Sequence, residues 1–291
     1  MRKIIIDTDP GQDDALAMMT AFGAKKDLNV LGVTCVAGNV PLDLTSVNAL
    51  KICELSGFFS VPVFRGSPAP LKRKLITAEH VHGKTGLDGT DLSVKKKELE
   101  PTDAVDFIIE CTEKYRDEKI TICALGPLTN VAKVLKKDSV LIESIEEIVL
   151  MGGGFFEGGN ITPAAEFNIW VDPEAAKIVL NSGVKITMLP LDVTHKTLVQ
   201  RDFLEKLRKS GKNSANEAAK LLDFFERYDV EKYGSQGGPL HDPNVIVYLL
   251  DPEIYEGKLV NVEIEVNSEL TRGMTVVDWW NVTNRQPNAY Y

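Results

Sequence analysis

The chain opens its first structural unit with Ile4-Ile5-Ile6-Asp7-Thr8-Asp9-Pro10-Gly11-Gln12-Asp13-Asp14. The apolar run predicts a buried strand, and because side chains on a strand alternate between its faces, Asp7 and Asp9 leave its end on the same side. The Pro10-Gly11 pair predicts a sharp turn. A helix should then begin near Asp13 or Asp14, one of which we expect as its N-cap, and continue through the good helix formers at 15–19.

These positions hold four carboxylates within eight residues. Carboxylates packed so closely raise one another's pKa unless a cation compensates their charge. An all-oxygen site suits calcium or magnesium rather than zinc. The alternative is that these acids only cap the helix, but a cap accounts for one or two of them and not for all four.

Composition indicates one large enzyme domain over residues 1–291. With 44% hydrophobic and 26% charged residues, the chain can bury a sizeable core. The formal charge of -9 disfavours a nucleic-acid partner, because such binding depends on clustered Lys and Arg. No apolar run approaches the ~20 residues of a membrane span, so we expect no membrane partner.

The four cysteines, at positions 35, 53, 111 and 123, lie among apolar neighbours without C-x-x-C spacing. We interpret them as reduced core residues. Met1-Arg2-Lys3 leads directly into the first strand with no signal-peptide region. The expected location is therefore cytoplasmic.

Short β-rich runs alternate with helical patterns along the chain. Strands are predicted at 4–7, 30–36, 61–64, 120–125, 148–151 and 186–189, and helices at 43–55, 102–115, 130–135, 173–180 and 201–208. Such alternation is typical of an α/β fold with a mostly parallel sheet. Asp172 followed by Pro173 predicts the start of one helix. Residues 260–266 alternate apolar and polar side chains, which predicts a half-exposed antiparallel strand and a mixed sheet.

A second polar group lies downstream. Glu166 and Asn168 are two apart, so on an extended segment they point one way and Phe167 the other. Together with Asn160, they could pair with the hydroxyls of a sugar. The alternative is that Asn160 and Asn168 only cap turns.

Three more signals follow in the same region. Asp192 and His195 add polar groups, and His241 stands beside an acid after the glycine-rich segment 234–239, where it is either structural or a proton donor. Gly152-Gly153-Gly154 does not continue as a dinucleotide-binding motif, because Glu157 occupies the place of its last glycine. We expect these glycines to allow close backbone approach.

Residues 7–14 resemble the D-x-D-P-G-x-D-D signature of the nucleoside hydrolases. The resemblance covers nearly the whole chain, because further blocks follow in the same order at 125–130, 151–154, 166–168, 171–176 and 241–243. It implies a Rossmann-like open α/β sheet with mostly parallel central strands, antiparallel additions and helices on both faces. It also implies a dimer or tetramer that cleaves the N-glycosidic bond of ribonucleosides with a tightly held calcium ion.

Carried over residue by residue, the resemblance implies that Ca²⁺ is bound, with a water, by Asp9, Asp14, Asp242 and the backbone carbonyl of Leu125. Asp7 would support these ligands, and Asp9 would also act as the general base. The ribose hydroxyls would be bound by Asp14, Asn168 and Asp242 on the 2′/3′ side and by Asn160 and Glu166 on the 5′ side. Asp13 is a further predicted substrate-binding residue. Such contacts predict rejection of 2′-deoxynucleosides.

The base-binding side also follows from the resemblance. His241 matches the acid that protonates the leaving base, and His82 matches a loop histidine that contacts it. Asn39 lies in the corresponding pocket, and Phe167 would form a wall. Aromatic residues at 224–228 are either core or lid, and we predict the lid role for Tyr228 and Tyr233.

Residues 238–242 resemble members that favour uridine and cytidine, which predicts pyrimidine substrates; a purine (inosine) preference or a non-specific enzyme is the alternative. Two hypotheses come from different classes of protein: a D-x-D phosphatase, which Pro10-Gly11 disfavours, and a non-catalytic ribose-binding protein, which would not need His241. The sequence ends at Tyr291, where family members generally continue through a last strand and helix, so we expect those elements to be missing.

Overall fold

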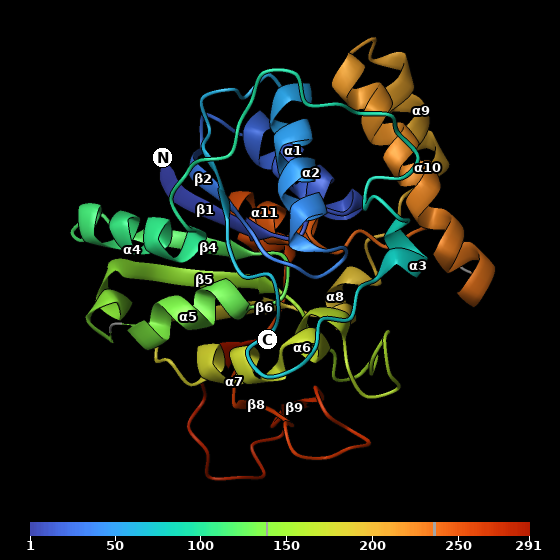
Figure 1. Cartoon of the computed structure of the whole chain (residues 1–291). Coiled ribbons are helices and arrows are strands. Elements are labelled where there is room, and N and C mark those ends of the chain that lie inside the picture. Colours follow the sequence, from blue (N-terminus) through green and yellow to red (C-terminus); the bar gives the residue numbers. More distant parts are fainter. Residues whose placement is uncertain (138, 235–236) are drawn as a thin grey trace.

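The computed structural model describes residues 1–137, 139–234 and 237–291. Among these residues, eight strands form one open sheet in the order β3-β2-β1-β4-β5-β6-β10-β7, and a separate sheet pairs β8 with β9 (Figure 1). Neighbours in the large sheet run parallel except β7 and β10. The predicted mostly parallel, mixed sheet is confirmed.

The strands are β1 (Arg2–Thr8), β2 (Leu28–Cys35), β3 (Val63–Arg65), β4 (Ile120–Ala124), β5 (Ile145–Met151), β6 (Ile186–Leu189), β7 (Leu259–Val260), β8 (Val262–Ile264), β9 (Thr275–Val277) and β10 (Ala289–Tyr290). The helices are α1 (Gln12–Gly23), α2 (Leu42–Leu55), α3 (Glu79–His82), α4 (Ala104–Lys114), α5 (Thr129–Lys137), α6 (Phe167–Val171), α7 (Pro173–Leu180), α8 (Leu191–Thr194), α9 (Arg201–Lys209), α10 (Asn213–Tyr233) and α11 (Pro243–Leu250). Two short 3-10 helices are η1 (Ser139–Ser144) and η2 (Pro252–Ile254).

Alternation along β1 divides the core between the two faces of the sheet. Ile4 and Ile6 belong to one hydrophobic cluster and Ile5 to the other. Helices α1, α2, α10 and α11 complete the first cluster, and α4, α5 and α7 complete the second. The predicted helices on both faces are therefore confirmed (Figure 1). No helix among the described residues is long and apolar enough to cross a membrane.

The predicted strands and helices are present, but two local expectations are wrong and some helices were not predicted, among them α11. Helix α1 begins at Gln12 with Gly11 as its N-cap, so Asp13 and Asp14 occupy its first turn instead of capping it. The single strand expected at 260–266 is divided into β7 and β8, which pair with different strands. Helix α11, which begins directly after Asp242, was not predicted.

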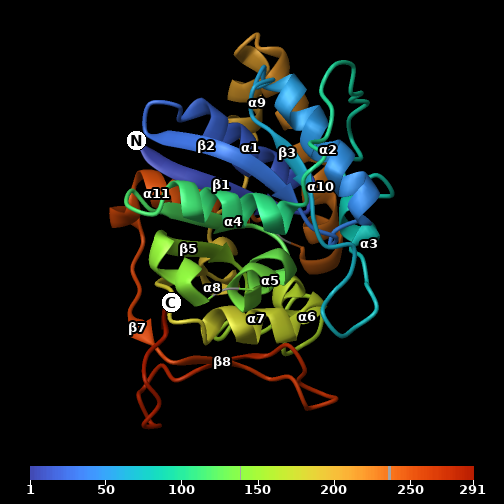
Figure 2. The ribbon, with the colours of Figure 1, turned by 60° about the vertical axis from the view of Figure 1, so that its left-hand side comes forward.

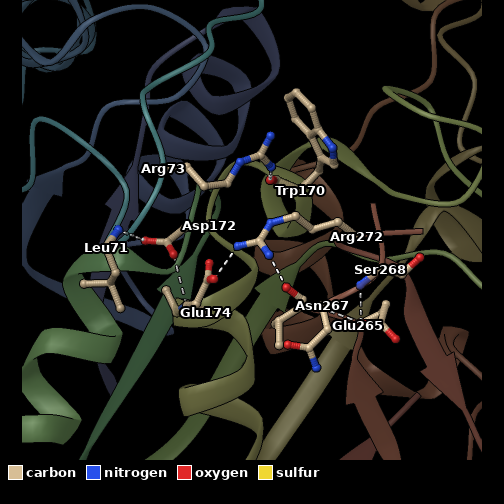
Figure 3. Close-up of polar contacts among 11 residues, drawn as sticks. Leu71, Arg73, Trp170, Asp172, Glu174, Glu265, Asn267, Ser268 and Arg272 are labelled. Carbon is tan, nitrogen blue, oxygen red and sulfur yellow. Dashed lines mark hydrogen bonds and ion pairs between the residues drawn. The ribbon is translucent and has the colours of Figure 1, made fainter. Parts of the chain in front are cut away.

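Two arginines contact helices α6 and α7, one from the segment between β8 and β9 and the other from the loop around residue 73 (Figure 3). Arg272 donates to Glu174 on α7 and to the carbonyl of Val266. Arg73 donates to the carbonyl of Trp170 on α6, and its guanidinium lies 4.2 Å from the centroid of the Trp170 ring. These contacts hold α6 and α7 in place, and α6 carries part of the candidate site.

The strand order places the site at the centre of the sheet. Strands β2 and β3 follow β1 outward on one side, whereas β5 and β6 follow β4 outward on the other. In open α/β sheets, ligands bind beyond the carboxyl ends of the strands where the order reverses in this way. Asp9 and Leu125 directly follow the two central strands, and α3 and α6 lie at the same end of the sheet (Figure 2).

Candidate active site

Asp7 supports the site from inside the sheet. Its Oδ1 accepts hydrogen bonds from Thr34 Oγ1 at 2.6 Å and from Asn130 Nδ2 at 2.8 Å. Burial raises the pKa of Asp7 to about 6, and these two bonds oppose the rise. The side chain does not line the pocket described below.

Asp9 lies in a space that two glycines leave open. A Cβ atom on Gly38 would lie 2.0 Å from Asp9 Oδ2, and one on Gly126 would lie 2.2 Å from Oδ1. Oδ2 accepts the backbone N–H of Asn39 at 2.7 Å, whereas Oδ1 is buried and has no hydrogen-bond partner in the described part of the chain. Burial, and next the charge of Asp14, hold the pKa of Asp9 well above its usual range.

Asp14 connects the loop after β1 to the start of α1. Its Oδ2 accepts the backbone N–H of Gly11 and the side-chain amide of Asn39, each at 3.0 Å. Its Oδ1 accepts the hydroxyl of Thr8 and the backbone N–H of Asp9. Asp14 is therefore not the N-cap. From the third position of the helix, its side chain accepts the backbone N–H of the N-cap residue, as in one half of a capping box.

Three carboxylates converge beside this loop. Oxygens of Asp13, Asp14 and Asp242 lie within 4.8 Å of one another, and all three residues are buried. Burial, with the charge of Asp14 second, raises the pKa of Asp13 to about 8. Burial followed by the charge of Asp13 also holds the pKa of Asp242 well above its usual range.

The donor set at this cluster fits a hard divalent cation. Its charged groups are carboxylates, and the buried Oδ1 atoms of Asp9 and Asp13 have no hydrogen-bond partner among the described residues. Asp9 lies outside the set whose oxygens meet within 4.8 Å. The ligand set Asp9, Asp14, Asp242 and Leu125 carbonyl stays a prediction.

A pocket lies directly against this cluster. Its lining brings together most of the predicted substrate residues: Asp13, Asn39, His82, Asn160, Glu166, Phe167, Asn168, Tyr228, His241 and Asp242, with Leu125. Asp9 and Asp14 are not part of the lining and are buried close beside it. The side chain of Tyr233 and residues 235–236 of the glycine-rich segment lie outside what the structure describes.

The amide and carboxylate of α6 form one side of the pocket. Glu166 is the N-cap of α6 and accepts the backbone N–H groups of Asn168 at 2.9 Å and Gly153 at 3.0 Å. Because α6 begins at Phe167, the alternation of side chains that an extended segment would give does not apply, and Phe167 lines the same pocket as its neighbours. Asn168 Nδ2 donates to the carbonyl oxygens of Leu125 at 2.7 Å and Met151 at 3.2 Å.

Asn160 occupies a turn position beside this helix. Its Oδ1 accepts the backbone N–H of Phe167 at 3.0 Å. This contact is of the kind that the turn-capping alternative expects. Asp192 does not reach the pocket, because its carboxylate accepts the backbone N–H groups of residues 155–157 and the hydroxyl of Tyr291. The triple glycine approaches other backbone and side chains closely, as expected, with Gly153 donating to Glu166.

Two histidines also line the pocket, His82 buried and His241 half-buried. His82 stacks on Phe225 with ring centroids 5.6 Å apart, and Phe225 meets His241 edge-on at 6.4 Å. His241 Nδ1 lies 2.8 Å from Thr194 Oγ1. Burial lowers the pKa of both histidines to about 3, so both rings are neutral in this environment.

Sequence reasoning missed several lining residues. His195 belonged to the predicted polar group without a role, and His80 and Phe225 were not assigned to the site; all three line the pocket. Phe225 and Tyr228 are three apart on α10 and so share a helix face, which is the signal that could have paired them. His80 contacts Tyr228 with ring centroids 5.6 Å apart.

An open α/β sheet with carboxylates, amides and imidazoles around one pocket is typical of an enzyme that hydrolyses a small polar molecule. The sequence pattern of the family described as inosine-uridine preferring nucleoside hydrolase matches residues 4–291. The chain belongs to this family. Its class is therefore that of the ribonucleoside hydrolases, which cleave N-glycosidic bonds, and this prediction is confirmed over the phosphatase and binding-protein hypotheses.

Individual relatives agree with this assignment. The protein named pyrimidine-specific ribonucleoside hydrolase RihA from Shewanella sp. (strain MR-7) is 46% identical over 289 residues, covering 99% of this chain and 90% of that protein. The solved structure of a plant nucleoside hydrolase, PpNRh1, has a TM-score of 0.93 and 32% identity, covering 99% of this chain and 93% of that chain. The solved structure of a purine-preferring ribonucleoside hydrolase from Gardnerella vaginalis has a TM-score of 0.92 and 31% identity, covering 99% of this chain and 92% of that chain.

Proposed function

We propose that this chain hydrolyses pyrimidine ribonucleosides to ribose and free base with a resident Ca²⁺ ion. The observation that carries the proposal is the group of three buried carboxylates, Asp13, Asp14 and Asp242, whose oxygens lie within 4.8 Å of one another beside a pocket of amides and histidines. Such carboxylates are costly to bury as anions unless a cation lies among them.

Asp9, Asp14, Asp242 and the carbonyl of Leu125 are the groups proposed to hold the ion. When bound, Ca²⁺ supplies charge compensation and lowers the pKa of water in its coordination shell. Leu125 is oriented by the amide of Asn168, which already donates to one lone pair of its carbonyl oxygen. A carbonyl oxygen has a second lone pair, so this contact and a ligand role are compatible.

Asp9 is proposed to take the proton of the attacking water, and His241 is proposed to stabilise the departing base. Asp9 Oδ1 has no partner among the described residues and so can accept a proton from the attacking water. If Thr194 donates its hydroxyl hydrogen to His241 Nδ1, the neutral ring keeps its hydrogen on Nε2 and can donate a hydrogen bond to the departing base, which stabilises the negative charge that develops there. Together, the two residues serve attack and departure at opposite faces of the sugar.

The ribose is proposed to lie between the carboxylate cluster and α6. Asn168 uses both its N–H groups on backbone carbonyls, which leaves its Oδ1 to accept from a hydroxyl on the 2′/3′ side with Asp13. Asn160 and Glu166 would bind the 5′ hydroxyl. The surrounding carboxylates would stabilise positive charge that develops on the sugar as the glycosidic bond breaks.

The base is proposed to lie between His82 and His241. Asn39 would stand at the inner edge of this region, Phe167 would form a wall, and Tyr228 would cover the opening. The pyrimidine preference is supported by relatives named pyrimidine-specific at 46% and 41% identity. The similarity to a purine-preferring enzyme makes inosine the competing substrate to test.

We also propose that the protein forms a dimer or tetramer and acts in the cytoplasm. Large exposed apolar side chains near the C-terminus, including Leu270 at 86% exposure and Trp280 at 76%, support an assembly surface. Four buried, unpaired cysteines support a reducing compartment. Light scattering on the purified protein measures the assembly directly.

The decisive experiment measures release of ribose after exhaustive chelation and after return of Ca²⁺ or Mg²⁺. Substrates are uridine, cytidine, inosine and 2′-deoxyuridine, with p-nitrophenyl phosphate as the control for phosphatase activity. We expect turnover only with metal, best with Ca²⁺ and with uridine or cytidine, and almost none with the deoxynucleoside. Full activity after chelation, or faster cleavage of inosine, would contradict the corresponding part of the proposal.

A further inference from the structure

Gln12 contacts His82 at the wall of the pocket. The distance from Gln12 Oε1 to His82 Nδ1 is 2.7 Å, and both residues are buried. A Cβ atom on Gly11 would lie 2.3 Å from His82 Nδ1, so the absent side chain at that position lets the ring lie against the loop. Gln12 is one of the two variable positions within the D-x-D-P-G-x-D-D signature, and the proposed reaction assigns it no role.

The orientation of the Gln12 amide is fixed by its other end. Its Nε2 donates to the backbone carbonyl oxygens of His82 at 2.9 Å and Asp88 at 3.2 Å. In the flipped orientation, the amide oxygen would face two carbonyl oxygens and both N–H groups would lose their acceptors. Gln12 Oε1 therefore faces the ring.

This orientation decides which ring nitrogen of His82 carries hydrogen. An amide oxygen only accepts hydrogen bonds, so His82 Nδ1 must be the N–H donor. In a neutral imidazole, the other nitrogen then holds a lone pair. Burial, which lowers the pKa of His82 to about 3, keeps the ring neutral. His82 Nε2 is thus an acceptor available to a ligand in the pocket.

We propose that Gln12 is a specificity-determining residue, because it holds His82 in the tautomer whose Nε2 accepts a hydrogen bond from a ring N–H of the nucleobase. This inference rests on the proposed nucleoside hydrolysis. It favours bases with a hydrogen on the ring nitrogen that faces His82, such as uracil, over bases with a lone pair there, such as cytosine. His241, which lines the same pocket, contributes the complementary donor.

The tautomer is tested first, on the protein without substrate. Nitrogen-15 NMR of the imidazole rings distinguishes a protonated from an unprotonated ring nitrogen, and the chain has only four histidines to assign. We expect His82 to carry its hydrogen on Nδ1 in the wild type and to lose this preference in Gln12→Met. A wild-type ring with its hydrogen on Nε2 would overturn the proposal, whether or not the protein is active.

The specificity is tested by comparing uridine with 3-methyluridine, which lacks the ring N–H, and with cytidine. We expect the wild type to favour uridine in kcat/KM by at least about tenfold over each, and Gln12→Met to lose most of this ratio. Gln200→Met is the matched control, because Gln200 is exposed and makes no side-chain capping bond. An unchanged ratio in Gln12→Met overturns the specificity role. If the wild type cleaves no nucleoside, the proposed function fails while the NMR result still stands.

Discussion

The backbone amide of Asn39 donates to Asp9 Oδ2 at 2.7 Å, whereas Oδ1 of the same carboxylate is buried without a partner among the described residues. One oxygen therefore fixes the orientation of the carboxylate, and the other remains able to accept a proton. This division of roles distinguishes Asp9 from Asp14, whose two oxygens accept hydrogen bonds from four groups of the surrounding loops.

The first prediction concerns Asp9→Asn. Asparagine can keep the bond from the Asn39 amide through its oxygen but cannot take up a proton, so we expect kcat to fall by about 10² to 10⁴ while binding of uridine is kept. Steady-state kinetics at saturating Ca²⁺ and calorimetric titration with nucleoside measure the two effects. Asp117→Asn, an exposed position, is the control. Unchanged turnover would remove Asp9 as the base.

The second prediction concerns the contact of 2.8 Å between Thr194 and His241. Without the hydroxyl, the proton of His241 is no longer directed to Nε2, so we expect Thr194→Val to lower kcat for uridine by about tenfold or more. Thr194→Ser, which keeps the hydroxyl, should retain most activity. p-Nitrophenyl riboside releases a stable anion and needs no proton, so its turnover should change little. An equal loss with both substrates would indicate a structural role instead.

The third prediction concerns the stability contributed by Glu166. Burial raises its pKa from 4.5 to about 7 in the folded protein, although the bonds from backbone N–H groups oppose the rise. Because the folded state holds this proton more tightly than the unfolded state, the contribution is full below pH 4.5 and is lost as the pH rises to about 7.

Glu166→Gln removes this titration. As the pH rises from 4.5 to about 7, the wild type loses this contribution and the variant does not. We therefore expect the unfolding free energy of the wild type to fall by about 3 kcal/mol relative to that of the variant over this range. Urea unfolding in the presence of chelator, at several pH values, measures the difference. Other groups titrate in both proteins and cancel. Parallel stability curves would show that Glu166 is not protonated in the folded state.

Much of the fold was predictable because its signals are local. Asp172 and Pro173 mark the start of α7 at the predicted residue, where Asp172 accepts the N–H of Ala175 at 3.1 Å. The break at Asn261 was not predictable from alternation, because β7 pairs with β10, whereas the backbone N–H of Val262 donates to Oδ1 of Asn288, which is 26 residues away. Long-range partners decide such a break.

In the candidate site, too, some features follow from local sequence signals and others depend on long-range packing. The signature placed the acids correctly at the end of β1, and the pocket gathers the predicted substrate residues. The two-residue spacing of Glu166 and Asn168 did not reveal their local structure. The carboxylate of Glu166 accepts backbone N–H groups at the start of α6 and so caps a helix there. Phe225 and His80 depend on how α10 packs against α3, which no local pattern specifies.

The last prediction uses the space around Asp9. The backbone of Gly126 is not in the left-handed region, so an alanine there would cause no backbone strain. Its Cβ atom would, however, lie only 2.2 Å from Asp9 Oδ1. Because the carboxylate must move to admit the methyl group, we expect Gly126→Ala to lower kcat/KM for uridine by about 10², since displacements near 1 Å have effects of this size. Gly23→Ala is the matched control, because nothing lies within 4 Å of its Cβ. Equal activity of the two variants would show that the position of Asp9 does not limit the reaction.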